Sequence, residues 1–156
     1  MGAWSTYGLN DLLMFSPETY FRLYELYNAD LWPGQVLVLA LTVKLVMLTD
    51  RPSVAGTRWV GLLLAAAWAA VAGFFFLGRY ADINLAAPWF AAGFFVQAVL
   101  WAGAAVPGRP RYAWAEGAAG RTGLALLGYA VAVHPLLGPL AGRQWQGVEL
   151  FGLAPD

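Results

Sequence analysis

Hydrophobic residues gather in long blocks along this chain, and short polar segments separate the blocks. Two blocks, residues 59–77 and 86–106, stand on either side of a polar turn within residues 78–90. Each block is about as long as a helix that crosses ~30 Å of hydrocarbon. The segment between them is too short to hold a water-soluble domain. The pattern therefore predicts a membrane hairpin, in which a tight turn joins two spanning helices.

Two more apolar blocks complete the pattern. In the last of them Pro135 follows His134 and removes a backbone donor, so we expect a kink or an unwound turn there. Spanning blocks must be helical, because backbone groups that face lipid have to bond within their own segment. We therefore predict an all-α integral membrane bundle of four transmembrane helices, with residues 31–156 as one membrane domain and spans at about 31–49, 59–77, 86–106 and 122–141.

Residues 1–30 are amphipathic and lack the apolar length of a span. Ser16 followed by Pro17, with Glu18 in the first turn, is typical of a helix N-terminus. The segment that follows is rich in tyrosine, a residue that suits the lipid headgroup layer. We expect either an amphipathic interfacial helix or a surface helix packed on the bundle.

Composition supports a membrane protein. Of 156 residues, 60% are hydrophobic and 12% are charged, and the mean hydropathy is +0.59. Soluble domains are closer to half apolar and a quarter charged. The formal net charge is zero, which leaves no basic footprint for nucleic acid. The chain has no cysteine, which excludes disulfides and thiolate chemistry.

Basic residues are distributed unequally between the two predicted sides. Lys and Arg concentrate in the cytoplasmic loops of membrane proteins. More Lys and Arg residues lie on the side of the loops after the first and third spans than on the opposite side. We therefore predict that this side is cytoplasmic and that both termini lie outside. The two groups are Lys44, Arg51, Arg58, Arg109, Arg111 and Arg121 against Arg22, Arg79 and Arg143.

Small residues recur at helical spacing in the second block. Ala65, Ala69 and Gly73 stand four apart and form one stripe. Such stripes let helix backbones approach closely in lipid, so we expect this helix-packing face to meet another helix of the chain or of a neighbour. The phenylalanines at positions 74–76 would then face lipid or the interface. Expected partners are the lipid bilayer and either other membrane subunits or a second copy.

Motifs for catalysis are absent from the sequence. It contains no phosphate-binding glycine loop and no paired histidines with the spacing of a zinc site. We therefore expect no enzymatic activity, no catalytic residue, no cofactor and no metal.

The polar residues of the predicted outer surface form one candidate site. They could build an outward-facing vestibule with the single histidine at its floor. Alternatively they solvate loops, with Arg79 paired to an acid and His134 bonded to a tyrosine or a freed carbonyl, and we favour this second interpretation. For His134 we favour a brace of the Pro135 kink over a proton relay, because its neighbours are apolar. The vestibule candidates are His134, Arg79, Tyr80, Asp82, Asn84, Asn28 and Glu149.

A family resemblance extends over most of the chain. The segments FSPETYFRLYELYNADLWP, RYADINLAAPWFAAGF and ELFGLAPD resemble an uncharacterised family of bacterial multi-pass membrane proteins, which are loosely labelled permease-like. The resemblance implies a bacterial inner membrane location and no particular chemistry. It also implies that relatives continue past the last motif into further hydrophobic sequence. We therefore expect that relatives have a fifth span, which is missing from this sequence.

Two functional hypotheses follow. The first is a helix-packing accessory or structural subunit of a homo-oligomer or of a larger membrane complex, because small-residue surface is abundant and intramembrane charge is scarce. The second is a transporter or channel-like protein for a small solute, which would use the outer vestibule above His134. The transporter hypothesis requires polar vestibule residues that are free to bind a solute, whereas the packing hypothesis does not.

Overall fold

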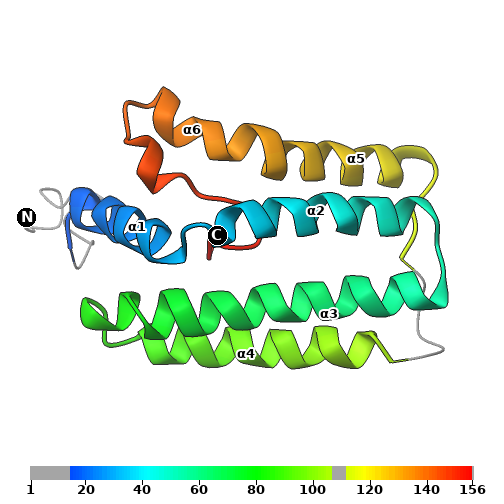
Figure 1. Ribbon diagram of the computed structural model, residues 1–156, viewed down its shortest axis with the longest axis horizontal. Coiled ribbons are helices and arrows are strands. Elements are labelled where there is room, and N and C mark those ends of the chain that lie inside the picture. Colours follow the sequence, from blue (N-terminus) through cyan, green and yellow to red (C-terminus); the bar gives the residue numbers. More distant parts are fainter. Residues whose placement is uncertain (1–14, 107–111, 156) are drawn as a thin grey trace, which may run out of the picture.

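Four long helices lie side by side in the computed structural model, which describes residues 15–106 and 112–155 (Figure 1). They are α2 (Gly34–Asp50), α3 (Val54–Ala70), α4 (Ala87–Ala104) and α5 (Gly117–Gly128). The described residues contain no strand. The predicted all-α fold is confirmed at this level.

Two of the four helices continue beyond their α-helical part through a π-helix. From α3 the chain passes directly into η3 (Val71–Leu77), and from α5 it passes through η5 (Tyr129–Val133) into α6 (His134–Leu140). Of the kink or unwound turn expected at Pro135, the unwound turn is wrong, because His134 keeps helical dihedrals and the helix runs on to Leu140. The missing donor of Pro135 is instead accommodated next to a wider π-helical turn.

Among the described residues, three helices are long and apolar enough to cross a membrane: residues 54–82, 87–104 and 117–140. The α2 helix is shorter, about 25 Å at 1.5 Å per residue. It qualifies as a fourth span only when it is taken together with the helix before it. The third predicted span thus matches its helix closely. The helices of the second and fourth predicted spans begin earlier, at Val54 and Gly117. The start at Val54 is fixed by Ser53, whose side chain accepts a hydrogen bond from the Gly56 N–H at 2.9 Å.

The α1 helix (Pro17–Leu31) crosses the end of the bundle. Its predicted N-cap is confirmed, since the Ser16 side chain accepts from the Thr19 N–H. A bend of 86° separates α1 from α2 at the cis peptide bond between Trp32 and Pro33. The near right angle turns α1 across the axis of the four long helices.

Packing is tightest between α3 and α4. A Cβ atom added at Gly61 would lie only 2.9 Å from the Ala105 Cβ and 3.0 Å from the Trp101 carbonyl oxygen. Towards the other end the rings of Trp68 and Phe94 pack with their centroids 4.5 Å apart. These two helices therefore form a closely packed hairpin, joined by the short η4 helix (Tyr80–Asp82).

The described core lies where α1 meets the η3–η4 end of this hairpin. Tyr24, Tyr27 and Phe75 are the largest side chains that are fully buried, and Leu153 packs against them. The prediction that residues 74–76 face lipid or the interface is thus wrong for Phe75 and Phe76, which are buried, while Phe74 is exposed. Packing of α1 on the bundle, the second alternative for this helix, explains the difference.

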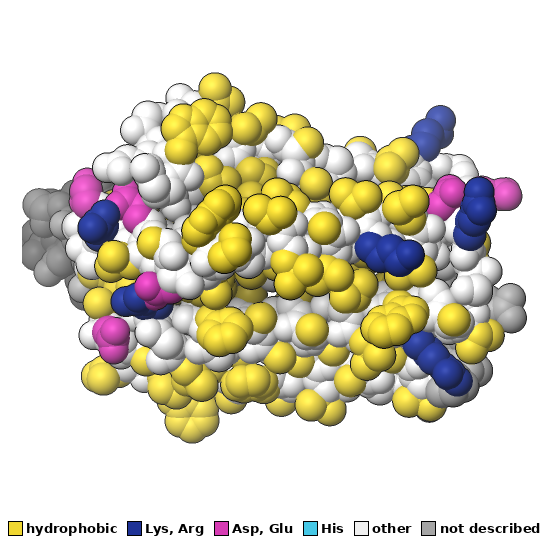
Figure 2. All heavy atoms as spheres, viewed as in Figure 1, with side chains coloured by type: hydrophobic (Ala, Val, Ile, Leu, Met, Phe, Trp, Pro, Cys, Tyr) yellow, Lys and Arg dark blue, Asp and Glu magenta, His cyan; other side chains and the backbone are white. Residues whose placement is uncertain are grey.

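Charged and apolar side chains occupy different zones of the surface. In the face shown in Figure 2, most charged side chains lie toward the two ends and hydrophobic side chains cover the middle. One end carries α1, the turn around η4 and the connection between α6 and η6, and the other carries the α2–α3 connection and the start of α5 (Figure 1). We call these the α1 end and the α2–α3 loop end.

Candidate functional site

The C-terminal residues 141–155, which we call the tail, fold back into the bundle after α6. They pass through η6 (Trp145–Gly147), which lies against α1. Further on, Gly152 has φ 84° within a turn that the Leu153 N–H closes on the Leu150 carbonyl. This conformation favours glycine. A Cβ at Gly152 would lie 3.4 Å from Val38 of α2, so the tail reaches the flank of the long helices.

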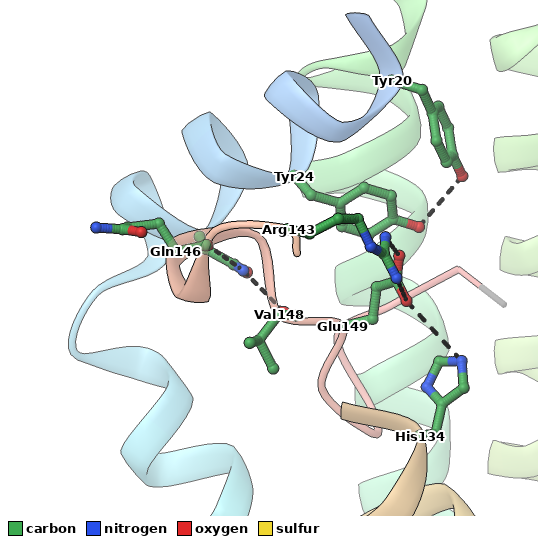
Figure 3. A network of polar contacts seen from close by, with 8 residues as sticks. Tyr20, Tyr24, His134, Arg143, Gln146, Val148 and Glu149 are labelled. Atoms are coloured by element: carbon green, nitrogen blue, oxygen red, sulfur yellow. Dashed lines mark hydrogen bonds and ion pairs between the residues drawn. The ribbon is translucent and has the colours of Figure 1, made fainter. Parts of the chain in front are cut away.

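Two neighbouring side chains of α1 fasten the tail. The Asn28 amide donates to the carbonyl oxygens of Gln146 and Val148, each at 2.8 Å (Figure 3). The Tyr27 hydroxyl donates to the Leu153 carbonyl at 3.2 Å. Burial raises the pKa of the Tyr27 phenol to about 12, so the group keeps the proton that it donates. Asn28 therefore satisfies tail backbone rather than standing free at a surface.

An ionic cluster connects the tail to the last helix. Arg143 donates to the Glu149 carboxylate at 2.8 Å, and the same carboxylate lies 3.9 Å from His134 Nε2 (Figure 3). The Arg143 guanidinium also stacks over the Phe21 ring of α1, 4.4 Å from its centroid. The cluster thus joins α6, the tail and α1.

The remaining vestibule candidates lie around the turn between η3 and α4. Arg79 forms an ion pair with Asp30 of α1. The buried Asn84 donates to the Tyr80 hydroxyl at 2.8 Å and accepts from the Ala86 N–H at 2.8 Å, which fixes the start of α4. Asp82 is exposed. All seven candidates lie at or near the α1 end, as expected, but they divide into a tail group and a turn group.

Two apolar cavities lie beside the tail, between the long helices. The larger has a volume of about 480 Å³ and the smaller about 210 Å³. They share walls at Leu64 and Ala67 of α3 and at Phe151 and Gly152 of the tail. The remaining wall of the larger cavity is formed by Trp68, Val71, Phe94, Tyr129, Ala130, His134, Leu150, Ala154 and Pro155. His134 therefore borders a mostly apolar cavity and the ionic cluster at the same time.

The predicted packing stripe meets open space at Gly73. Ala65, Ala69 and Gly73 are all partly buried, and a Cβ at Gly73 would meet no atom within 4 Å. The close approach between helices occurs at Gly61 instead. Contact of the stripe with a neighbouring protein stays a prediction.

Some residues of the site were not singled out in the sequence. Arg143 and Asp30 provide the ion-pair partners, and Tyr27 holds the end of the tail. Tyr20, Tyr24 and Tyr27 recur at the spacing of one helical face, a signal that could have identified the buried side of α1. Among the described residues, no group of three His, Asp or Glu side chains is arranged to hold a metal ion.

Residues 17–155 match a family of unknown function, DUF6064. The chain belongs to this family. No curated protein and no solved structure matches it. The DUF6064 match begins at the first residue of α1 and includes the tail, so both segments lie within the matched region.

Proposed function

We propose that this chain is a multi-pass membrane protein that acts as a helix-packing subunit of a homo-oligomer or of a larger membrane complex. Three helices of spanning length and an apolar middle zone with charged ends support insertion in a bilayer. The larger number of Lys and Arg residues in the loops after the first and third predicted spans supports a cytoplasmic position for those loops, with both termini outside. The family resemblance supports a bacterial inner membrane.

The observation that carries the packing role is the isolation of the helix formed by residues 117–140. Its apolar window has a mean hydropathy of 1.5, yet only 11% of the positions in it are buried. Among the described residues, α5 has no buried side chain and makes no extensive contact with α2, α3 or α4. Gly123 and Gly128 leave open space where a Cβ would stand. Small residues on an open helix face suit close approach by another helix.

The polar layer supports the same role. A solute vestibule needs polar groups that are free to bind, whereas Asn28, Asn84 and Arg79 here bond to other parts of the chain. Glu149 is likewise held by Arg143. These interactions hold α1, the turn and the tail against the long helices, so the polar groups have a structural role.

The test uses the absence of cysteine from the chain. Leu126→Cys places one thiol on the open face of α5, where Leu126 is 63% exposed, and Val99→Cys places one on the lipid-facing side of α4, where Val99 is 71% exposed. The two positions lie about 21 Å and about 18 Å from the α1 end of their helices, so they are matched in depth. Each variant is labelled in native membranes with a maleimide that carries a photoreactive group and is then illuminated.

We expect Leu126→Cys to give protein adducts, either a dimer of this chain or a larger species, at a yield well above that of Val99→Cys. Mass spectrometry of the adduct separates self-association from a different subunit. Equal yields at the two positions, together with a monomer in mild detergent, would contradict the packing role.

A small-solute transporter remains the second candidate, and one observation favours it. The non-helical tail lines a cavity beside His134, and transporters place irregular backbone at such cavities. A solute flux into vesicles that depends on the reconstituted protein and drops in His134→Ala would support this candidate. A flux that the substitution leaves unchanged would remove it.

A further inference from the structure

The larger cavity lies within the apolar zone of the bundle. His134 stands about 9 Å and Tyr129 about 16 Å below the end of the last helix, measured from Leu140 at 1.5 Å per residue. The opposite wall consists of Leu64, Ala67 and Trp68 in the outer half of α3. If the chain is inserted as proposed, this cavity is at the depth of the lipid hydrocarbon and not at the surface.

The lining determines what can fill the cavity. Apart from His134, Tyr129 and the indole of Trp68, its side chains are aliphatic or phenyl groups. A mostly apolar lining favours apolar molecules over water. An empty volume of about 480 Å³ would leave many lining atoms without contact partners, which costs dispersion energy. A hydrocarbon chain from the bilayer matches the apolar lining and restores the missing contacts.

The length of the cavity separates a hydrocarbon chain from a helix. Its wall on α3 and η3 runs only from Leu64 to Val71, about 10 Å at 1.5 Å per residue. A transmembrane helix is about three times as long, so most of such a helix would lie outside the cavity. A flexible hydrocarbon chain, which is much thinner, can follow the space between α3, η5 and the tail.

We propose that this cavity is a binding site for the hydrocarbon chain of a membrane amphiphile, either an acyl chain or an isoprenyl chain. Trp68 and Phe94 form one wall and Tyr129 and Ala130 the other, with Leu150 and Phe151 of the tail as the cover. The proposal rests on the membrane insertion proposed above and is independent of the packing role.

The test measures where a photoreactive chain is held. Purified protein is reconstituted in vesicles that contain either a phospholipid with a diazirine on its acyl chain or a polyprenyl alcohol with the same group. After illumination, labelled peptides are mapped by mass spectrometry. We expect one of the two probes to label the cavity wall at Trp68, Phe94 and Tyr129, in addition to labelling of lipid-facing α4 at Val99.

Two substitutions fill the cavity from opposite walls, Ala130→Phe and Ala67→Phe. Each should lower labelling of the cavity wall by about fivefold or more, because the new ring occupies the space of the chain, while labelling at Val99 stays the same. Ala132→Phe is the matched control, since Ala132 is exposed on the same helix and does not line the cavity. The unfolding midpoint of each filling variant shows whether it folds normally. If one of the two is destabilised, the labelling test relies on the other filling variant.

Three outcomes would overturn the proposal. The first is cavity labelling that both filling variants leave unchanged, which indicates bulk lipid. The second is labelling at Val99 without labelling of the cavity wall by either probe. The third is no labelling at Val99, which would refute membrane insertion itself and thereby this site. The probe that labels the wall identifies the chain as acyl or isoprenyl.

Discussion

The α3–α4 hairpin and the helix of residues 117–140 have similar apolar composition and opposite packing. A third of the apolar window in the α3 segment is buried (33%), against 11% in the last helix. The hairpin closes at Gly61 and Ala105 with no room for an added methyl group, whereas Gly123 and Gly128 of the last helix face open space. Hydrophobicity alone therefore does not decide whether a helix finds a partner within its own chain.

The difference lies in what holds each helix in place. In the hairpin, α3 and α4 are held together by side-chain packing along their whole length. The last helix is connected mainly at its end, by Arg143, Glu149 and the tail. We infer that the hairpin and α1 form the stable part of the molecule and that the last helix is the part available to other molecules.

The largest expected effect is the loss of the hairpin core. Phe75→Ala removes a fully buried ring and should destabilise the protein by about 3–5 kcal/mol. Phe74→Ala, at the neighbouring exposed position, should cost much less. Denaturant unfolding in detergent measures both. If the two variants unfold alike, the hairpin is not better packed than a lipid-facing surface and the comparison fails.

A second test asks whether the close approach in the hairpin is tight. Gly61→Leu pushes a side chain into Ala105 and the Trp101 carbonyl and should cost about 1–3 kcal/mol or more. Gly123→Leu, where the added group meets open space, should leave the unfolding free energy within about 1 kcal/mol, since leucine also favours helix. Equal losses would show that the last helix is packed as tightly as the hairpin.

A third test concerns the connection of the last helix. Arg143→Ala removes the partner of Glu149 and the contact with Phe21, and should weaken the connection by about 1 kcal/mol because the pair is partly exposed. Hydrogen exchange should accelerate in the tail and in α6 and stay unchanged in α3 and α4. Arg22→Ala, which removes an exposed pair within α1, is the control. Faster exchange in α3 would contradict a separate connection.

The smallest effect belongs to Tyr27. Tyr27→Phe loses one hydrogen bond to the tail, worth about 0.5–1.5 kcal/mol. Burial raises the pKa of this phenol from 10.0 to about 12, so its contribution is fully present below pH 10 and is lost as the pH rises through 12. The unfolding midpoint of the native protein should therefore fall more steeply in this alkaline range than that of Tyr27→Phe. Parallel pH profiles would show that Tyr27 is not buried.

Element type could be predicted from the sequence, and packing partners could not. Long apolar blocks and the Ser16-Pro17 cap indicated the helices, because length and capping are local properties. Phe75 and Gly61 were missed because helices that are apolar on all sides do not show which face is buried. Glu149 and His134 were both vestibule candidates, and they lie 3.9 Å apart. The fastening of the tail by Asn28 depends on the reversal of the chain after α6, which no local pattern specifies.

The π-helical segment Tyr129–Val133 has a rotational consequence for the outer half of the last helix. One residue corresponds to about 100° of azimuth in an α-helix, so a single π bulge turns everything beyond it by about that angle relative to an ideal helix. His134 points at Glu149 only with this phase offset. Deleting one residue from the segment would remove the bulge and leave His134 facing the tail, whereas α-helical winding that keeps all five residues would rotate His134 away from Glu149 by about that angle.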